Sequence, residues 1–466
     1  MAMLHIHSKY MGNKNYYTLI LLMLCSISFQ AQTKKWTLKE CVNYAVQNNI
    51  SIKQTALDTE TAQIDKRGAI GNFLPSLNTS GSHSWNVGLN QDITTGLLQN
   101  QTTQFTSIGA TVGVDIYKGL QNQNTLRNAR LSLIAAQYQL TKMREDIALN
   151  VANAFLQVLF NKENLKVQKD QLAIDEKQLL RSQELVKAGS IPSGDLLDAK
   201  ATVANDNQKL IAADNALLIS KLSLSQLLQL KDFENFDIED STQVQDENNI
   251  LAQTPLSIYD MAKGNRTELK IAQTNLEIAE KNLAIAKGGF QPTLRGFYNF
   301  NSRISYSDIA IRDNQGAIVG VQSAPPFFDQ FNNNKGQSFG AQLSIPIFNG
   351  FSASNNVERS KVNLEKSKIA LEQQELDLER NVYLAFTDAK GALKAHESAL
   401  VALESRQAAF DYAKEKYDVG LMNSFDLNQS QTLLSNAQSE VLRSKYDYIF
   451  KIKILEFYFG IPIIKN

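Results

Sequence analysis

The sequence contains the same turn twice, and this duplication restricts the folds that the chain can adopt. Residues 186–200 read VKAGSIPSGDLLDAK, and residues 417–431 read YDVGLMNSFDLNQSQ. The two stretches align at an offset of 231 residues, which places Gly189 over Gly420, Ser193 over Ser424 and Asp195 over Asp426. A chain with such internal similarity is expected to consist of two structural repeats.

Further matches extend the duplication beyond the turn. GNFLPSL (71–77) matches GGFQPTL (288–294) at an offset of 217, whereas IYKGLQNQN (116–124) matches IFNGFSASN (347–355) at an offset of 231. The offset grows by 14 between these matches, so we expect a 14-residue insertion in a loop of the second copy, because insertions collect where the chain meets solvent. Each repeat is predicted to run helix, strand, variable loop, strand, helix, turn, helix.

These matches define the expected domain boundaries. A signal peptide at 1–31 precedes a first repeat at 32–230, with a β-hairpin at 75–118 and a turn at 187–195. A linker at 231–257 joins it to a second repeat at 258–466, with a hairpin at 292–348 and a turn at 417–426. The leader is indicated by Lys9 and Lys14 before the apolar run TLILLMLCSISF, which is too short to span a bilayer. Cleavage after Ser28 and cleavage after Ala31 both fit.

Composition narrows the class of protein. The 466 residues include 47 basic and 47 acidic side chains, so the overall balance gives no reason to expect nucleic acid as a partner. If Cys25 is discarded with the leader, Cys41 alone remains, and no intrachain disulfide can form. Beyond residue 31 no stretch approaches 18 apolar residues, so an exported chain of this kind can enter a membrane only as a β-barrel.

Long helices are expected because all eight prolines fall outside six proline-free segments. These are residues 37–70, 119–186, 193–230, 258–288, 350–416 and 423–458. Two rows of residues recur every seven positions: Val151, Val158, Leu165, Leu172, Leu179 and Val186 in one, and Leu371, Leu378, Ala385, Ala392 and Ala399 in the other. Sustained seven-residue spacing predicts helices wound together as coiled coils.

Four segments alternate between apolar and polar residues, as strands with two different faces do. They lie at 76–90, 104–117, 292–302 and 338–348. The same alternation occurs in a soluble sheet packed on a core and in a lipid-facing barrel with a wet lumen. We favour the barrel, because the helices are committed to coiled coils. Four strands cannot close one, so copies of the chain must share it, giving eight strands in a dimer or twelve in a trimer.

The order of these motifs resembles the TolC-like outer-membrane efflux protein family over essentially the whole mature chain. WTLKECVNYAVQNN resembles the opening helix of the family, NFLPSL and GFQPTL its helix-to-strand motifs, and VKAGSIPSGD and YDVGLMNSFD its periplasmic turns. The resemblance implies an α+β membrane protein, a homotrimer with a long coiled-coil α-helical barrel and a shared twelve-stranded β-barrel in outer-membrane lipid. It also implies a periplasmic adaptor (membrane fusion protein) and an inner-membrane RND or ABC transporter as partners.

The resemblance assigns candidate gating residues at the periplasmic aperture. Asp426 matches an acid that forms a ring at the entrance, and Asp195 and Tyr417 match residues that hydrogen-bond between helix pairs to keep the mouth shut. Gln429 and Met422 stand where the family has a second ring carboxylate and an arginine. A structural interpretation is also open: Ser193 with Asp195, and Ser424 with Asp426, suit helix N-caps and first-turn acids. Gly189 and Gly420 are expected to end the preceding helices.

The predicted function is that of a passive exit duct of a tripartite efflux or type I secretion system, located in the outer membrane of a Gram-negative bacterium and extending into the periplasm. The alternative is a periplasmic coiled-coil adaptor or scaffold without a channel, for which one helical hairpin and small β domains are expected. No metal-spaced cluster, nucleophile elbow or phosphate loop occurs, so we expect no enzymatic activity, metal or cofactor. The sequence leaves the transported substrate and the type of pump open.

Overall fold

The computed structural model describes the chain except residues 1–34, 92–96, 234, 240–249 and 462–466. The predicted leader and part of the predicted linker therefore lie outside the described residues. The chain divides into two compact units. The first unit comprises Met1–Lys53, Met143–Asn265 and Leu378–Asn466, and the second comprises Gln54–Lys142 and Arg266–Asp377.

The helices occur in pairs of equal length. Helices α2 (Leu38–Asn48) and α6 (Pro255–Asn265) have 11 residues each, and α3 (Ile50–Gly71) and α7 (Thr267–Gly288) have 22 each. Helices α4 (Gln121–Lys187) and α9 (Ser352–Asp418) have 67 each, and α5 (Ser193–Leu228) and α10 (Ser424–Phe459) have 36 each. None of the described helices is both long enough and apolar enough to cross a membrane. Each of these helices of the first repeat thus has a counterpart of the same length in the second repeat, in agreement with the duplication in the sequence.

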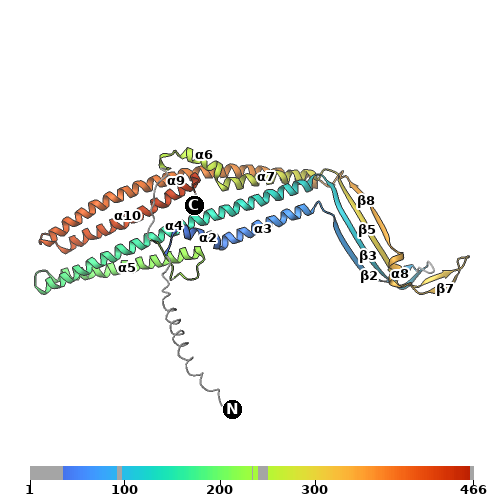
Figure 1. The fold of residues 1–466 in the computed structure, drawn as a ribbon, viewed down its shortest axis with the longest axis horizontal. Helices are drawn as coiled ribbons and strands as arrows, with labels where there is room; N and C mark the ends of the chain where they lie inside the picture. Colours follow the sequence, from blue (N-terminus) through green and yellow to red (C-terminus); the bar gives the residue numbers. More distant parts are fainter. Residues whose placement is uncertain (1–34, 92–96, 234, 240–249, 462–466) are drawn as a thin grey trace, which may run out of the picture. The chain divides into compact units, whose positions relative to one another are not determined.

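Two antiparallel helical hairpins make up most of the first unit (Figure 1). One is formed by α4 and α5, and the other by α9 and α10. The predicted seven-residue rows lie in the packed seams: Val151 and Val158 are fully buried, and Leu378 and Ala392 are 4% exposed. Several seam positions of α9 are alanine, whose small side chain lets the backbones of the packed helices approach closely.

Two of the predicted helices are broken in the structure, which corrects the expectation of single helices at 37–70 and 258–288. The first is interrupted at Asn49, whose ψ of 133° is extended and whose Oδ1 accepts a hydrogen bond from the N–H of Ser51 at 2.9 Å. The amide of Asn49 also donates to the carbonyl of Leu227 at 3.1 Å, so the break is fastened to α5. The second break falls at Arg266, with ψ of 130° and an ion pair to Glu268 at 2.8 Å.

The start of α6 is also earlier than expected. Pro255, which the sequence places outside every helix, is its first residue. Proline is tolerated there because its missing N–H would have no partner in the first turn. The Oγ1 of Thr254 accepts a hydrogen bond from the N–H of Ser257 at 3.2 Å and so satisfies one of the free amides of that turn.

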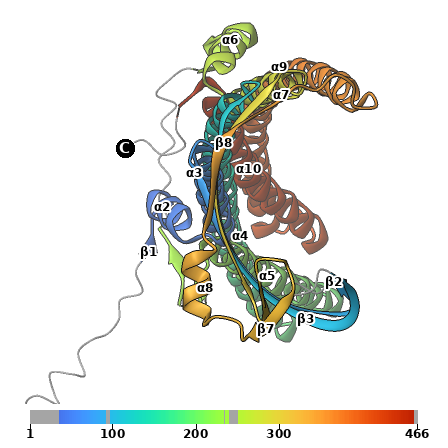
Figure 2. The same ribbon diagram turned by 90° about the vertical axis from the view of Figure 1, so that its right-hand side faces the viewer.

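The second unit holds one four-stranded antiparallel sheet with the order β2-β3-β5-β8 (Figure 1), and Figure 2 shows the same strands from another side. The strands are β2 (Ser76–Gln91), β3 (Leu98–Lys118), β5 (Thr293–Ser305) and β8 (Gly336–Ser344). The register aligns the apolar positions that the alternation predicts, since Leu77 lies opposite Val112, Val112 opposite Tyr298, and Tyr298 opposite Phe339. These four side chains form one row across the sheet, because directly opposed residues share a face.

Between β5 and β8 lies the extra structure that accounts for the shift in repeat offset. A small hairpin of β6 (Ile309–Arg312) and β7 (Ile318–Gln322) is followed by the short helix α8 (Phe327–Asn333). The helix is fixed beside β5, because Ser302 Oγ donates to the carbonyl of Phe331 at 2.9 Å and Asn334 donates to that of Arg303 at 2.6 Å. The first repeat has no counterpart of α8 among its described residues.

Two glycines are in tight contact at the junction between β3 and α4. Gly119 has a φ of +56°, and a Cβ placed on it would meet the carbonyl oxygen of Gly288 at 2.3 Å. A Cβ on Gly288 would in turn meet the carbonyl oxygen of Gly119 at 2.5 Å. Gly350, which aligns with Gly119, has a φ of +61° but open space around it. Both repeats thus have a left-handed backbone at this glycine, but only in the first repeat does another segment of backbone pack closely against it.

Candidate functional site

The first of the two turns ends α4 with a Schellman motif, a common way to satisfy the last carbonyls of a helix. Gly189 has a φ of +70°, and its N–H donates to the carbonyl of Val186 at 3.0 Å. The N–H of Ser190 donates to the carbonyl of Leu185 at 2.9 Å. Glycine suits this position because the left-handed conformation strains any side chain with a Cβ.

The second turn has the same geometry at the end of α9. Gly420 has a φ of +78°, and its N–H donates to the carbonyl of Tyr417 at 3.1 Å. The N–H of Leu421 donates to the carbonyl of Lys416 at 2.8 Å. Neither glycine has an atom within 4 Å of where a Cβ would lie, so backbone conformation alone, not crowding, requires it.

The helix starts after the turns differ from the expected N-caps. Ser193 and Ser424 are the first residues inside α5 and α10, so the predicted serine caps are wrong by one position. The N-cap of α10 is Asn423, whose Oδ1 accepts a hydrogen bond from the N–H of Asp426 at 2.8 Å. The N-cap of α5 is Pro192, which has no side chain able to cap. The two copies therefore share a turn but not a cap.

Asp195 and Asp426 occupy the third position of their helices, where an acid interacts favourably with the positive end of the helix dipole. Asp426 is exposed, and Asp195 is half-buried. Both carboxylates therefore lie at the tip of a hairpin, within the first turn after the chain reverses. Their gating roles remain predictions, as does the hydrogen bonding of Asp195 between helix pairs.

Tyr417 joins the two hairpins just above the turns. Its hydroxyl accepts a hydrogen bond from Nε2 of Gln178 on α4 at 2.9 Å, and the guanidinium of Arg181 lies 5.9 Å from its ring centre. Arg181 also forms an ion pair with Asp418 at 2.7 Å. Within the described chain, the Tyr417 hydroxyl thus pairs with Gln178, not with Asp195. The sequence does not single out Gln178 or Arg181, because glutamine and arginine are ordinary residues of a solvated helix face.

Deeper in the same unit, a buried polar cluster connects three helices. Asp175 of α4 is 3% exposed and accepts hydrogen bonds from Gln171 at 2.7 Å and from Gln431 of α10 at 2.7 Å. Asp206 of α5 is 4% exposed and pairs with Lys209 at 2.9 Å. Burial and the neighbouring carboxyl group of Asp206 raise the pKa of Asp175 to about 7, against the opposing effect of the hydrogen bonds from Gln171 and Gln431. Sequence reasoning missed this cluster.

A signal for the cluster is nevertheless present in the seven-residue spacing. Four consecutive seam residues of α4, from Val158 to Leu179, are each followed three positions later by a buried polar residue. This row reads Asn161, Gln168, Asp175 and Ser182. The facing row on α5 reads Ala199, Asp206, Ala213 and Ser220, again buried and again seven apart. Polar residues that keep the seam period are expected inside the helix contact, where they fix register at some cost in stability.

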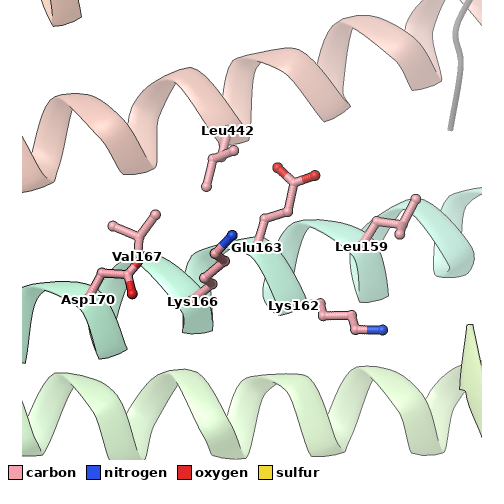
Figure 3. Close-up of a pocket in the computed structure, with 7 residues that line it drawn as sticks. All are labelled: Leu159, Lys162, Glu163, Lys166, Val167, Asp170 and Leu442. Carbon is pink, nitrogen blue, oxygen red and sulfur yellow. The ribbon is translucent and has the colours of Figure 1, made fainter. Parts of the chain in front are cut away.

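Above the cluster, an open groove of about 590 Å³ separates parts of α4 and α10 (Figure 3). Leu442 of α10 points toward a row on α4 that includes Glu163, Lys166 and Val167. At its edge the hydroxyl of Tyr446 donates to Glu163 at 2.5 Å. The charged lining residues are half-buried or exposed and carry both signs, so the groove itself does not select a charged ligand.

The short strand β4 (Asp237–Ile238), which pairs in parallel with β1 (Lys35–Trp36), is fixed by two lysines. Lys162 of α4 and Lys221 of α5 approach Asp237 at 3.1 and 3.0 Å. Partial burial works against ionisation, but hydrogen bonds and charge from Lys221 and Lys162 outweigh it and lower the pKa of Asp237. The chain that follows the first hairpin is thereby held against both of its helices.

The sheet of the second unit presents large apolar side chains to its surroundings. Leu77 is 67% exposed, Val87 81% and Phe339 82%. A contiguous exposed apolar face of this kind marks a surface that contacts another protein or lipid. The described residues contain no group of three or more His, Cys, Asp or Glu side chains placed to hold a metal ion.

Comparison with known proteins agrees with the fold. The family described as Outer membrane efflux protein matches residues 41–229 and 258–453. Outer membrane protein TolC of Vibrio cholerae serotype O1 is 21% identical over 427 residues, covering 89% of this chain and 88% of that protein. The Cation efflux system protein CusC of Escherichia coli O157:H7 is 26% identical over 199 residues, 41% of this chain and 42% of that one. The crystal structure of the outer membrane protein VceC from Vibrio cholerae superimposes with a TM-score of 0.75 at 15% identity, covering 91% of this chain and 96% of that one.

The paired helical hairpins, the four-stranded sheet and these matches define an outer-membrane channel fold of the TolC type. The chain belongs to the outer membrane efflux protein family. The predicted resemblance, fold class, efflux function and outer-membrane location are confirmed, and the adaptor alternative is not favoured. The family is one of channel and transport proteins.

Proposed function

We propose that the protein is the exit duct of a tripartite efflux or type I secretion system, in which three copies share one barrel of twelve strands. The observation that carries this proposal is the open sheet. Among the described strands, β2 pairs only with β3 and β8 only with β5, so both edges are free to pair. Strand edges that face lipid must be paired, because an unsatisfied backbone group there costs several kcal/mol.

The exposed apolar face supports the same assembly. Phe339, Val87 and Leu77 lie on strands whose edges are open, and lipid is the surroundings that such a face suits. Helices α4, α5, α9 and α10 then line the path through the periplasm. Transport through such a duct is passive, and energy and selection come from an inner-membrane pump, reached through a periplasmic adaptor.

The hairpin tips supply the proposed entrance. Asp426 is exposed at the start of α10, so three copies place three carboxylates in one ring. A ring of like charges in a narrow mouth focuses the field and attracts cations. In this arrangement Tyr417 and Asp195 hold neighbouring hairpins together when the mouth is closed.

The assembly is tested by electron microscopy of the full-length protein extracted from outer membranes in detergent. We expect threefold end views and rods longer than about 100 Å, the length of a 67-residue helix at about 1.5 Å per residue. Small monomeric particles, or protein that fractionates without detergent, would instead support the adaptor alternative. Crosslinking to adaptors of the same cell tests the partners.

A further inference from the structure

The buried cluster of Asp175 and Asp206 lies close to the proposed entrance. Asp175 is 12 residues before the end of α4, and Asp206 is 13 residues after the start of α5. At about 1.5 Å per residue the pair is roughly 18–20 Å from the turn. Gln431, seven residues into α10, reaches the same point from the second hairpin. One polar contact therefore fastens both hairpins near their tips.

The contacts around the pair leave one oxygen unsatisfied. Both oxygens of Asp175 are occupied, Oδ2 by the amide of Gln171 and Oδ1 by the amide of Gln431. Oδ1 of Asp206 forms an ion pair with the ammonium group of Lys209. Its buried Oδ2 has no hydrogen-bond partner among the described residues. A buried carboxylate oxygen without a hydrogen bond raises the free energy of the folded state, so a proton or another ligand is expected at this oxygen.

A proton satisfies this requirement. Two carboxyl groups that share a buried site cannot both ionise, so one of them retains a proton well above its ordinary range and donates it to the other. Asp175 and Asp206 are both buried and line the same small cavity, and burial together with the neighbouring carboxyl group of Asp206 raises the pKa of Asp175 to about 7. Protonation thus changes near neutral pH.

A metal ion suits the site less well. The carboxylates already accept N–H groups from Gln171, Gln431 and Lys209. The positive ends of these N–H groups point into the site and would repel a metal cation. The cavity beside the pair is about 10 Å³, room for about one water molecule. Among the described residues that line this cavity, Lys209 is the only charged one besides the two aspartates, and those contributed by α10 are uncharged.

We propose that Asp175 and Asp206 form a proton-operated latch between α4, α5 and α10. While one proton is shared, the carboxyl pair and the amide of Gln431 hold the three helices together. When the proton is lost, two adjacent buried carboxylates repel each other, and α5 separates from α4 toward the turn. The tip therefore loosens as the pH rises toward neutrality and tightens as it falls. The consequence for the channel mouth rests on the proposed function.

Hydrogen–deuterium exchange of the full-length protein in detergent tests the latch directly. Rates are corrected for the intrinsic pH dependence of exchange and compared at pH 6 and pH 8. We expect amides at residues 196–209 to exchange on the order of tenfold faster at pH 8, because pH 6 lies about one unit below the raised pKa of Asp175 and each such pH unit shifts the ratio of released to held forms about tenfold. Asp175→Asn and Asp206→Asn, which cannot ionise, are expected to remove this difference.

Asp214→Asn, at an exposed acid further along α5, is the matched control and is expected to behave as the unaltered protein does. Equal exchange at the two pH values in the unaltered protein would overturn the proposal, and so would a tenfold rise that persists in both variants. Conductance in planar bilayers is measured alongside and is expected to rise with pH in the unaltered protein only. Absence of conductance at every pH would overturn the duct instead, and the exchange result would still decide the latch.

Discussion

Gln178 of α4 donates a hydrogen bond of 2.9 Å to the hydroxyl of Tyr417 of α9, and this bond joins one helical hairpin to the other beside the turns. Tyr417→Phe removes it without changing the shape of the ring. Because such a bond contributes about 1 kcal/mol, we expect a roughly fivefold shift toward a loosened tip. Conductance in planar bilayers should increase, and Tyr412→Phe, on an exposed face of α9, should leave it unchanged. Equal conductance in the two variants would refute a holding role for Tyr417.

Asp426 is expected to control ion selectivity at the entrance. Asp426→Ala removes the ring charge but keeps the backbone N–H that Asn423 caps at 2.8 Å, so α10 should still begin at the same residue. We expect reduced cation selectivity and weaker block by divalent cations, measured from reversal potentials and titrations in bilayers. Asp411→Ala, at an exposed acid before the turn, serves as the control. Unchanged selectivity in Asp426→Ala would assign the residue to helix stability alone.

Gly119 and Gly350 offer a matched pair for backbone strain. Both have left-handed φ, but only Gly119 faces a carbonyl, that of Gly288. We expect Gly119→Ala to destabilise the protein by on the order of 2–4 kcal/mol, since strain and overpacking add, and Gly350→Ala to cost only about 1 kcal/mol. Thermal unfolding followed by circular dichroism measures the difference. Similar losses in both variants would show that the Gly119–Gly288 contact relaxes easily.

The apolar face of the sheet is expected to meet lipid. Phe339→Arg places a charge on that face, and a charge near the middle of the bilayer destabilises a strand by about 2–4 kcal/mol. Ser338→Arg places the same charge on the opposite face of β8, where we expect a small effect. The yield of folded protein in outer membranes and urea unfolding in lipid vesicles compare the two. Equal losses would contradict the assignment of the faces.

Asp237 is expected to make part of the stability depend on acid. Its pKa is lowered in the folded state, so its stabilisation is complete above the unfolded value of about 4 and is lost as the pH falls through the folded one. Lys221→Met weakens this effect, so the variant should melt below the unaltered protein at pH 7 and approach it at pH 3. Lys231→Met, at an exposed position, is the control. A constant difference at both pH values would mean that Lys221 acts by packing.

Much of the fold follows from periodicity. The ends of α4, α5, α9 and α10 lie within two residues of the expected positions, because proline, glycine and seven-residue spacing mark them clearly. The breaks at Asn49 and Arg266 were not expected, because neither residue is a helix breaker by propensity. Asn49 interrupts its helix through tertiary contact with Leu227, which local sequence cannot reveal.

The candidate site was only partly predictable. The turn glycines and first-turn acids stand out because backbone conformation and the helix dipole restrict residue choice locally. Asp175 and Asp206 do not, because long helices carry many acids and burial depends on which face meets a neighbour. Their one signal in the sequence is the seven-residue spacing, because polar positions that share the period of the apolar seam are buried with it.

The equal lengths of α4 and α9, and of α5 and α10, have a consequence for redesign. Removing one heptad from a single helix would displace its turn by roughly 10 Å relative to the neighbouring hairpin and would break the seam register. The length of the helical segment can therefore change only in concerted steps, seven residues at a time in all four helices. A peptide inserted between β6 and β7 would not change the packing of the helices, so that hairpin is a suitable place for an affinity tag.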